Sequence, residues 1–170
     1  MKHVTPENSA TESPQQRHAR AMDKIAALVG VRERTCVELQ RRLVGLGYTQ
    51  QETDEAIESA VRCGLVSEER FTRAFIRGKT SLGWGKRKIV ERLEGEGIAE
   101  ELIARCSDEF ASPDAELEAA VHALRCRSTS SKDPRAAYMR RLLSKGYTYE
   151  TAQRAVELYL GTSEVPACLS

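Results

Sequence analysis

Apolar residues recur along this chain at the three- and four-residue spacing of amphipathic helices, with capping signals between the runs. In the first third this pattern predicts three helices, which end at or just after Gly30, at Gly47 and before Gly64. A Ser-Pro step at 13–14 and Thr-x-x-Glu boxes at 35–38 and 49–52 supply their starts. The positions expected to face inward are Met22, Ile25, Ala26, Val29, Leu39, Leu43, Leu46, Ala56, Ile57, Ala60 and Val61.

The same pattern then repeats twice. It predicts helices over residues 67–80, 85–96 and 99–110, and a further group that starts at Ser112-Pro113 and Asp133-Pro134 and ends with a helix over 149–160. In helix 67–80 the spacing directs Phe71, Ala74, Phe75 and Gly78 inward. We therefore divide the chain into a disordered arm (1–12), three helical repeats (13–64, 65–111 and 112–161) and a flexible tail (162–170).

The three repeats can be aligned with one another on glycines 47, 97 and 146, which lie 50 and 49 residues apart. This alignment superposes Leu39, Ile89 and Tyr138, and likewise Leu43, Leu93 and Leu142. A fixed period of this size is typical of stacked helical units that bury their apolar faces against their neighbours. The sequence thus predicts an all-α protein, an elongated array of three tandem three-helix repeats.

Composition limits the functions open to the chain. An apolar fraction of 41% with only 5% aromatic residues suits helices, and no apolar run approaches the ~20 residues of a membrane helix. The five cysteines are widely separated, which favours reduced thiols over a zinc or disulfide framework. The sequence offers no candidate acid–base pair or nucleophile elbow, so we predict no enzyme, no catalytic residue, no metal and no cofactor.

Charge is unevenly distributed, although the whole chain carries only +1. Residues 70–92 hold eight basic residues and one acid, a local charge of +7, whereas residues 94–118 hold nine acids and one base, a local charge of −8. We call the eight basic residues the basic band and predict that they bind a polyanionic partner. They are Arg70, Arg73, Arg77, Lys79, Lys86, Arg87, Lys88 and Arg92.

Other positions extend this prediction. Arg41-Arg42 and Arg140-Arg141 occupy equivalent places in the first and third repeats, and we treat them as secondary candidates. The Gly83-Trp84-Gly85-Lys86 step is best interpreted as an interhelical loop, although the helix start that follows could hold a single backbone phosphate. Contact with phosphates would be independent of sequence and sensitive to salt, and an acidic protein groove is an equally suitable partner for such charge.

Three stretches of the chain resemble the RecX family of bacterial recombination regulators. They are AALVGVRERTCVELQRRLVGLGY, GLVSEERFTRAFIRGK and GKRKIVERLEGEGI, which together span about residues 20–106, with weaker similarity to about 160. The steps Arg34-Thr35, Glu38-Leu39 and Glu69-Arg70-Phe71 are the most specific. The chain departs from the family at Ser67-Glu68, where acidic residues are usual, and at Lys79, where arginine is usual.

The resemblance implies a non-enzymatic, cytoplasmic, monomeric protein of tandem three-helix repeats. Its implied partner is the RecA recombinase filament on single-stranded DNA, in homologous recombination, DNA repair and the SOS response. Binding would inhibit the ATPase, strand-exchange and co-protease activities of the recombinase, and DNA itself is a candidate for direct contact. The alternative is a general nucleic-acid-binding helical repeat protein that has no recombinase partner.

Overall fold

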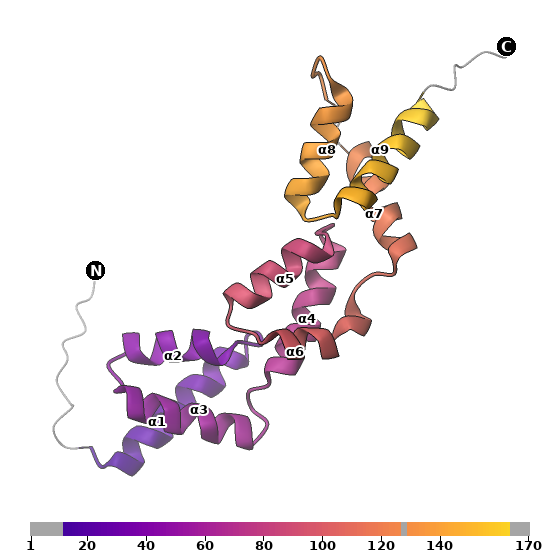
Figure 1. Cartoon of the computed structure of the whole chain (residues 1–170). Helices are drawn as coiled ribbons and strands as arrows, with labels where there is room; N and C mark the ends of the chain where they lie inside the picture. The colour runs from indigo at the N-terminus through magenta and orange to yellow at the C-terminus, as the bar shows by residue number, and fades with distance from the viewer. Residues whose placement is uncertain (1–11, 127–128, 164–170) are drawn as a thin grey trace. The chain divides into compact units, whose positions relative to one another are not determined.

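A computed structural model describes residues 12–126 and 129–163 of the chain. In these ranges all regular secondary structure is helical, as the hydrophobic pattern predicts (Figure 1). The chain divides into two compact units, with the boundary between Phe71 and Thr72, and we refer to the described parts as unit 1 and unit 2. The predicted arm and most of the predicted tail lie outside the described residues, and the boundaries of the three repeats stay predictions.

Unit 1 contains helices α1 (Pro14–Val29), α2 (Cys36–Gly45) and α3 (Gln50–Arg62) and the first residues of α4 (Glu68–Ser81). The predicted inward face is largely confirmed, but Ala26, Leu46 and Val61 are exposed. Leu46 follows the last residue of α2, where the chain leaves the helix and its spacing no longer applies. The core of this unit consists of Ala21, Ile25, Leu39, Leu43, Ala56, Ile57, Ala60 and Val66.

Hydrogen bonds between charged side chains and the backbone connect α1 to α2. The buried guanidinium of Arg34 donates a hydrogen bond to the carbonyl oxygen of Leu28 at 3.0 Å and another to the carboxylate of Glu38. Thr35 caps α2 by accepting the Glu38 N–H at 3.1 Å. Burial opposes ionisation of Glu38, but the hydrogen bond from Arg42 and the charges of Arg32 and Arg34 lower its pKa overall. The residues that carry the family resemblance here therefore hold the fold together.

The start of α3 carries a complete capping box. Thr49 accepts the Glu52 N–H, and the Glu52 carboxylate accepts the Thr49 N–H at 2.8 Å. Arg17 of α1 donates to the same carboxylate, with Nη2 3.0 Å from Oε2. The hydrogen bond from Arg17, followed by that from the Thr49 N–H, lowers the pKa of Glu52 to about 2.

This shift predicts how the stability of unit 1 depends on pH. The pKa of Glu52 lies below its ordinary value of 4.5, so its contribution is fully present above about pH 5 and is lost as the pH falls towards 2. Glu52→Gln should lower the urea midpoint at neutral pH and flatten its fall between pH 5 and 2, as followed by circular dichroism. Glu55→Gln on the same helix is the control, and an equal loss of slope in both variants would contradict the assignment.

Unit 2 contains the rest of α4 and then α5 (Lys86–Gly95), α6 (Glu100–Arg105), the short 3-10 helix η1 (Ser107–Glu109), α7 (Pro113–Arg125), α8 (Pro134–Lys145) and α9 (Tyr149–Ser163) (Figure 1). One core cluster joins α7, α8 and α9 and consists of Ala120, Leu124, Tyr138, Leu142, Tyr147, Ala152, Ala155 and Val156. Around α5 and α6 the buried residues are Ile89, Leu93, Ile98, Leu102, Ile103 and Cys106.

Three sequence predictions in α4 to α9 are wrong in detail. Phe71 is buried as predicted, but Ala74 and Gly78 are exposed, because α4 buries Thr72 and Ile76 instead. The helix predicted over 99–110 stops at Arg105 and is followed by the separate η1 turn. Helix α9 continues through Gly161 to Ser163, and Gly161 does not adopt the left-handed conformation in which glycine commonly ends a helix.

The internal alignment is confirmed. Glycines 47, 97 and 146 all have positive φ, at 90°, 84° and 90°. These values explain why glycine stands at each position, since residues with a Cβ rarely adopt this conformation. The aligned apolar residues Leu43, Leu93 and Leu142 are each fully buried, and so, almost completely, are Leu39, Ile89 and Tyr138.

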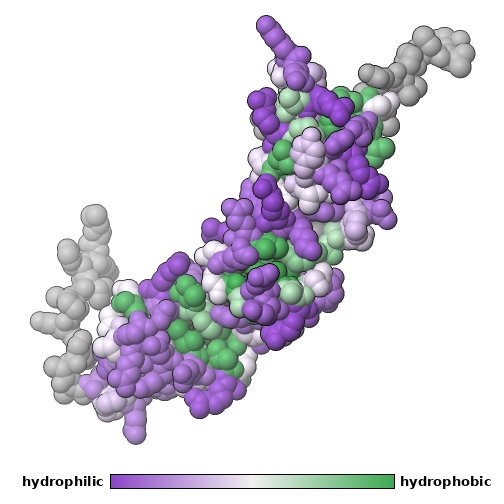
Figure 2. Space-filling model, in the orientation of Figure 1, coloured by the Kyte–Doolittle hydropathy of each residue, from purple (hydrophilic) through white to green (hydrophobic). Residues whose placement is uncertain are grey.

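Some apolar side chains remain at the surface, and Figure 2 shows hydrophobic atoms among hydrophilic ones on both units. The large exposed ones are Val31, Val44, Leu46 and Val61 in unit 1 and Leu82, Tyr149 and Leu158 in unit 2. Among the described helices, none is long and apolar enough to cross a membrane.

Candidate partner-binding surface

Four arginines of the basic band form ion pairs inside the chain. In unit 1, Arg70 pairs with Glu33 at 2.8 Å and also donates to the backbone carbonyls of Gly64 and Leu65. In unit 2 the partners are acids of the neighbouring acidic stretch. Arg73 pairs with Asp108 at 2.9 Å and with Glu109 at 3.3 Å, Arg77 pairs with Glu109 at 2.7 Å, and Arg92 pairs with Glu96 at 2.7 Å.

These pairs change the interpretation of the charge pattern. The η1 turn follows α6 and carries Asp108 and Glu109, which it places against two arginines of α4. Part of the positive charge of the basic band is thereby offset within the protein. Pairs this exposed contribute little stability, typically 0–1 kcal/mol each, so a polyanion can compete for the same arginines.

The other four cations of the basic band, Lys79, Lys86, Arg87 and Lys88, form no ion pair with a carboxylate of the described residues. The lysines lie instead over aromatic rings. Two of them share Trp84, with the Nζ of Lys79 4.8 Å and that of Lys88 4.6 Å from the ring centroid. The Nζ of Lys86 is 5.1 Å from the centroid of Phe110. Such contacts orient an ammonium group without neutralising it.

The first turn of α5 lies against the end of α8. Gly85 donates its N–H to the carbonyl of Lys145 at 2.9 Å, and Arg87 donates its N–H to the carbonyl of Gly146 at 3.2 Å. The guanidinium of Arg87 reaches the carbonyl of Leu143 at 2.9 Å, and the ammonium of Lys88 reaches that of Ser144 at 3.2 Å. Cations here complement the partial negative charge at the C-terminus of α8.

At this junction, neighbouring segments supply hydrogen-bond acceptors to the backbone N–H groups at the start of α5. The helix has no capping side chain of its own, and its Lys86 N–H donates to the carboxylate of Glu116 from α7 at 3.1 Å. The Glu116 carboxylate therefore occupies one N–H of the helix start at which a backbone phosphate could bind, and phosphate binding there stays a prediction. Burial, followed by the charge of Glu116, raises the pKa of Tyr147, whose hydroxyl donates to the carbonyl of Gly83 at 3.2 Å.

Two glycines permit the close approach of these segments. A Cβ on Gly85 would lie 2.3 Å from the backbone of Gly146 and Tyr147, and a Cβ on Gly146 would lie 2.2 Å from the Cβ of Lys88. Both distances are far shorter than a van der Waals contact. No periodicity or charge pattern in the sequence indicates this contact, and the role of Glu116 was missed for the same reason.

The secondary candidates are distributed over both units. In unit 1 Arg41 is exposed, and Arg42 donates to Glu38 at 3.1 Å. In unit 2 Arg140 is exposed, and the guanidinium of Arg141 lies 5.6 Å from the ring centroid of Tyr138. Arg141 and Lys145 of α8 line a common hollow with the α4–α5 loop, so the structure adds Lys145 to the candidate cations.

Residues 12–126 and 129–163 hold no group of three or more His, Cys, Asp or Glu side chains that could bind a metal ion. The arrangement consists of cations held by aromatic rings and by the ends of helices. Such a surface can bind an anionic partner through charge and hydrogen bonds.

Tandem helical repeats that display a charged surface define a class of binding proteins. Residues 67–106 match a family model described as RecX, second three-helix domain. Among curated proteins, the chain is similar to the Regulatory protein RecX of Mycolicibacterium smegmatis, with 27% identity over 100 residues, which cover 58% of this chain and 53% of the relative. It is 34% identical over 83 residues to that of Actinobacillus pleuropneumoniae serotype 5b, covering 49% of this chain and 55% of the relative.

These two matches span only about half the length of the relatives. A longer match to the Regulatory protein RecX of Chromohalobacter salexigens has 29% identity over 142 residues and covers 79% of this chain and 89% of the relative. The crystal structure of RecX from Lactobacillus salivarius shares the fold, with a TM-score of 0.71 at 16% identity over 85% of this chain and 97% of that one. Over residues 67–106 the chain thus matches the RecX family model, and its fold is that of a RecX crystal structure.

Proposed function

We propose that this protein acts in the cytoplasm as a monomeric regulator that binds the RecA recombinase filament on single-stranded DNA. Binding inhibits the ATPase, strand-exchange and co-protease activities of the recombinase, and the protein itself performs no catalysis. The match of residues 67–106 to the RecX family model and the name of the similar proteins, regulatory proteins, support the proposal. The observation that carries the proposed surface is the group Lys79, Lys86, Arg87 and Lys88, which forms no ion pair with a described carboxylate.

The members of this group differ in what they contribute. Arg87 and Lys88 also hold α8, so replacing them would disturb the fold as well as the surface. The ammonium groups of Lys79 and Lys86 lie over aromatic rings and form no ion pair with a described carboxylate, which leaves their charge available to a partner. We therefore expect Lys79 and Lys86 to contact the filament, and Arg73 and Arg77 to exchange their acidic partners for filament anions.

The test is inhibition of a recombinase ATPase that depends on single-stranded DNA. The double variant Lys79→Glu, Lys86→Glu should require about tenfold more protein for half-inhibition, which corresponds to roughly 1.4 kcal/mol of lost binding. The control is Lys132→Glu, Arg154→Glu, two exposed cations outside the basic band. Both variants should retain the helical dichroism and melting temperature of the wild type.

Salt provides the second readout. Added salt should weaken inhibition by the wild type more than by the double variant, because the screened charges have been removed from the variant. Equal half-inhibition by all three proteins at each salt concentration would refute the role of Lys79 and Lys86.

A general nucleic-acid-binding protein is the second candidate, and the same four cations support it. That function predicts tight binding of labelled single-stranded DNA in the absence of recombinase and no effect on the ATPase beyond competition for DNA. Fluorescence anisotropy with DNA alone, compared with the ATPase titration at saturating DNA, separates the two.

A further inference from the structure

A hollow of about 690 Å³ opens in unit 2 between the α4–α5 loop, α7 and α8. The end of α4 contributes Thr80 and Ser81, and the loop contributes Gly83 and Leu82, whose surface is 64% exposed. A Cβ placed on Gly83 would lie 3.8 Å from the Nζ of Lys145, so this ammonium group stands directly over the loop. The volume is in the range of sites that bind small ligands or short peptide segments.

The lining of this hollow combines cations with apolar surface. Its basic lining residues are His122, Arg141 and Lys145, and no Asp or Glu lines it. Ala119 and Ala123 of α7 supply a floor without long side chains. These alanines and Leu82 together form an apolar surface next to the cationic side chains.

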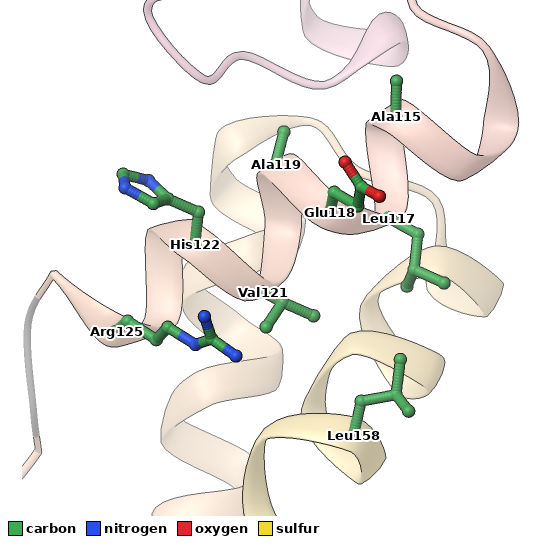
Figure 3. A pocket seen from close by; sticks show the side chains of 8 residues that line it. All are labelled: Ala115, Leu117, Glu118, Ala119, Val121, His122, Arg125 and Leu158. Carbon is green, nitrogen blue, oxygen red and sulfur yellow. The ribbon is translucent and has the colours of Figure 1, made fainter. Parts of the chain in front are cut away.

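A second hollow of similar size, about 710 Å³, also lies along α7 and shares Ala119 and His122 with the first, but its other lining residues differ. Figure 3 shows Leu117 and Val121 of α7 pointing towards Leu158 of α9, whereas His122 and Ala119 point away from α9. This hollow has Glu118 as well as Arg125 in its lining, so it presents both signs of charge. Of these two hollows, the one beside the α4–α5 loop combines apolar surface with charge of one sign.

The lining also distinguishes between anionic partners. Proteins that hold single-stranded nucleic acid without reading its sequence stack the bases on aromatic side chains, and no Phe, Tyr or Trp lines this hollow. A phosphate backbone would also leave Leu82 and the alanine floor without a partner. A peptide segment that carries carboxylates and an apolar side chain uses both parts of the lining.

We propose that this hollow binds a short segment of a partner protein that carries acidic side chains and at least one apolar side chain. The carboxylates lie beside Arg141 and Lys145, and the apolar side chain packs on Leu82 and the floor formed by α7. Binding of such a segment can be measured without a recombinase. A negative result would therefore leave the proposed regulatory function standing.

The protein has features that report directly on this hollow. Trp84 is the only tryptophan of the chain and directly follows Gly83 of the lining. Cys126 lines the hollow and is exposed, with its Sγ 3.7 Å from the Nδ1 of His122. Cys63 is likewise exposed but belongs to unit 1, so it serves as an internal control for alkylation.

The probe is a short synthetic peptide of alternating glutamate and leucine, compared with a peptide in which glutamine replaces every glutamate and with oligothymidylate. The acidic peptide should change the fluorescence of Trp84 and slow alkylation of Cys126 by iodoacetamide, while alkylation of Cys63 is unchanged in mass spectra. The glutamine peptide should bind about tenfold more weakly, since each lost factor of ten corresponds to roughly 1.4 kcal/mol.

Variants locate the site. Lys145→Gln and Arg141→Gln should each weaken binding of the acidic peptide several-fold. Lys145→Arg should bind the peptide like the wild type, because it keeps the charge, and Arg154→Gln on α9 should have no effect. Equal affinity for the two peptides, equal protection of Cys63 and Cys126, or protection by oligothymidylate but not by the acidic peptide would each overturn the proposal. The protection experiment uses the unmodified protein, so it decides the matter even if a variant does not fold.

Discussion

Gly146→Ala should cost unit 2 about 3–5 kcal/mol of unfolding free energy, combining left-handed backbone strain with overlap against a packed neighbour. Gly146 has a φ of 90°, and a Cβ there would lie 2.2 Å from the Cβ of Lys88 and 2.6 Å from its backbone nitrogen. Neither of these atoms is the end of a flexible side chain. The junction between α5 and α8 must therefore separate to admit a single methyl group.

Gly83→Ala is the matched control in the same unit. Its φ of 71° imposes a similar backbone strain, but its Cβ would meet only Lys145 Nζ and Tyr147 Oη, at ordinary contact distances of 3.8 and 3.9 Å. It should lose only about 1–2 kcal/mol. Urea unfolding followed by circular dichroism measures both variants, and a loss at Gly146 no larger than that at Gly83 would show that the segments separate easily.

Leu43→Asp, Leu93→Asp and Leu142→Asp should each remove several kcal/mol, on the order of the whole stability of a small domain. The three leucines are fully buried at equivalent positions of the internal alignment. An aspartate there must either stay protonated in an apolar environment or open the packing to water. Each variant should lose much of its cooperative thermal transition in circular dichroism.

Leu46→Asp tests whether the loss of stability depends on burial of the replaced leucine or only on the loss of an apolar side chain. The helical spacing predicts Leu46 to face inward with Leu43, but its surface is 58% exposed. The substitution should cost about 1 kcal/mol or less, chiefly because a negative charge is unfavourable near the end of α2. If it destabilises unit 1 as strongly as Leu43→Asp, the assignment of the inward face is wrong.

Local rules predicted most of the helices, because caps and apolar spacing are set by neighbouring residues. Ser13, Thr35, Thr49, Ser112 and Asp133 all cap helices where the sequence places them. The same rules fail where packing chooses between two faces of one helix. In α4 the fully buried residues are Thr72 and Ile76, while Ala74 of the predicted face is exposed.

The candidate surface was harder to predict, because a charge count records no partners. The local charge of +7 over residues 70–92 suggests one continuous polyanion site, yet Arg73 and Arg77 meet acids more than thirty positions away in sequence. Lys145 is a single basic residue next to a glycine, and no local sequence pattern marks it as a candidate binding residue. Its place beside Gly83 depends on the packing of α8 against the α4–α5 loop.

Amide hydrogen exchange offers a direct view of how the α5–α8 junction opens. The N–H groups of Gly85 and Arg87 are protected by the carbonyls of Lys145 and Gly146, which belong to a distant part of the chain. Their exchange rates should therefore report detachment of α8, whereas the N–H of Ile89, which bonds to the Gly85 carbonyl, reports fraying of α5 itself. The exchange rates of the Gly85 and Ile89 amides, which lie one helical turn apart, would thus report two separate opening events.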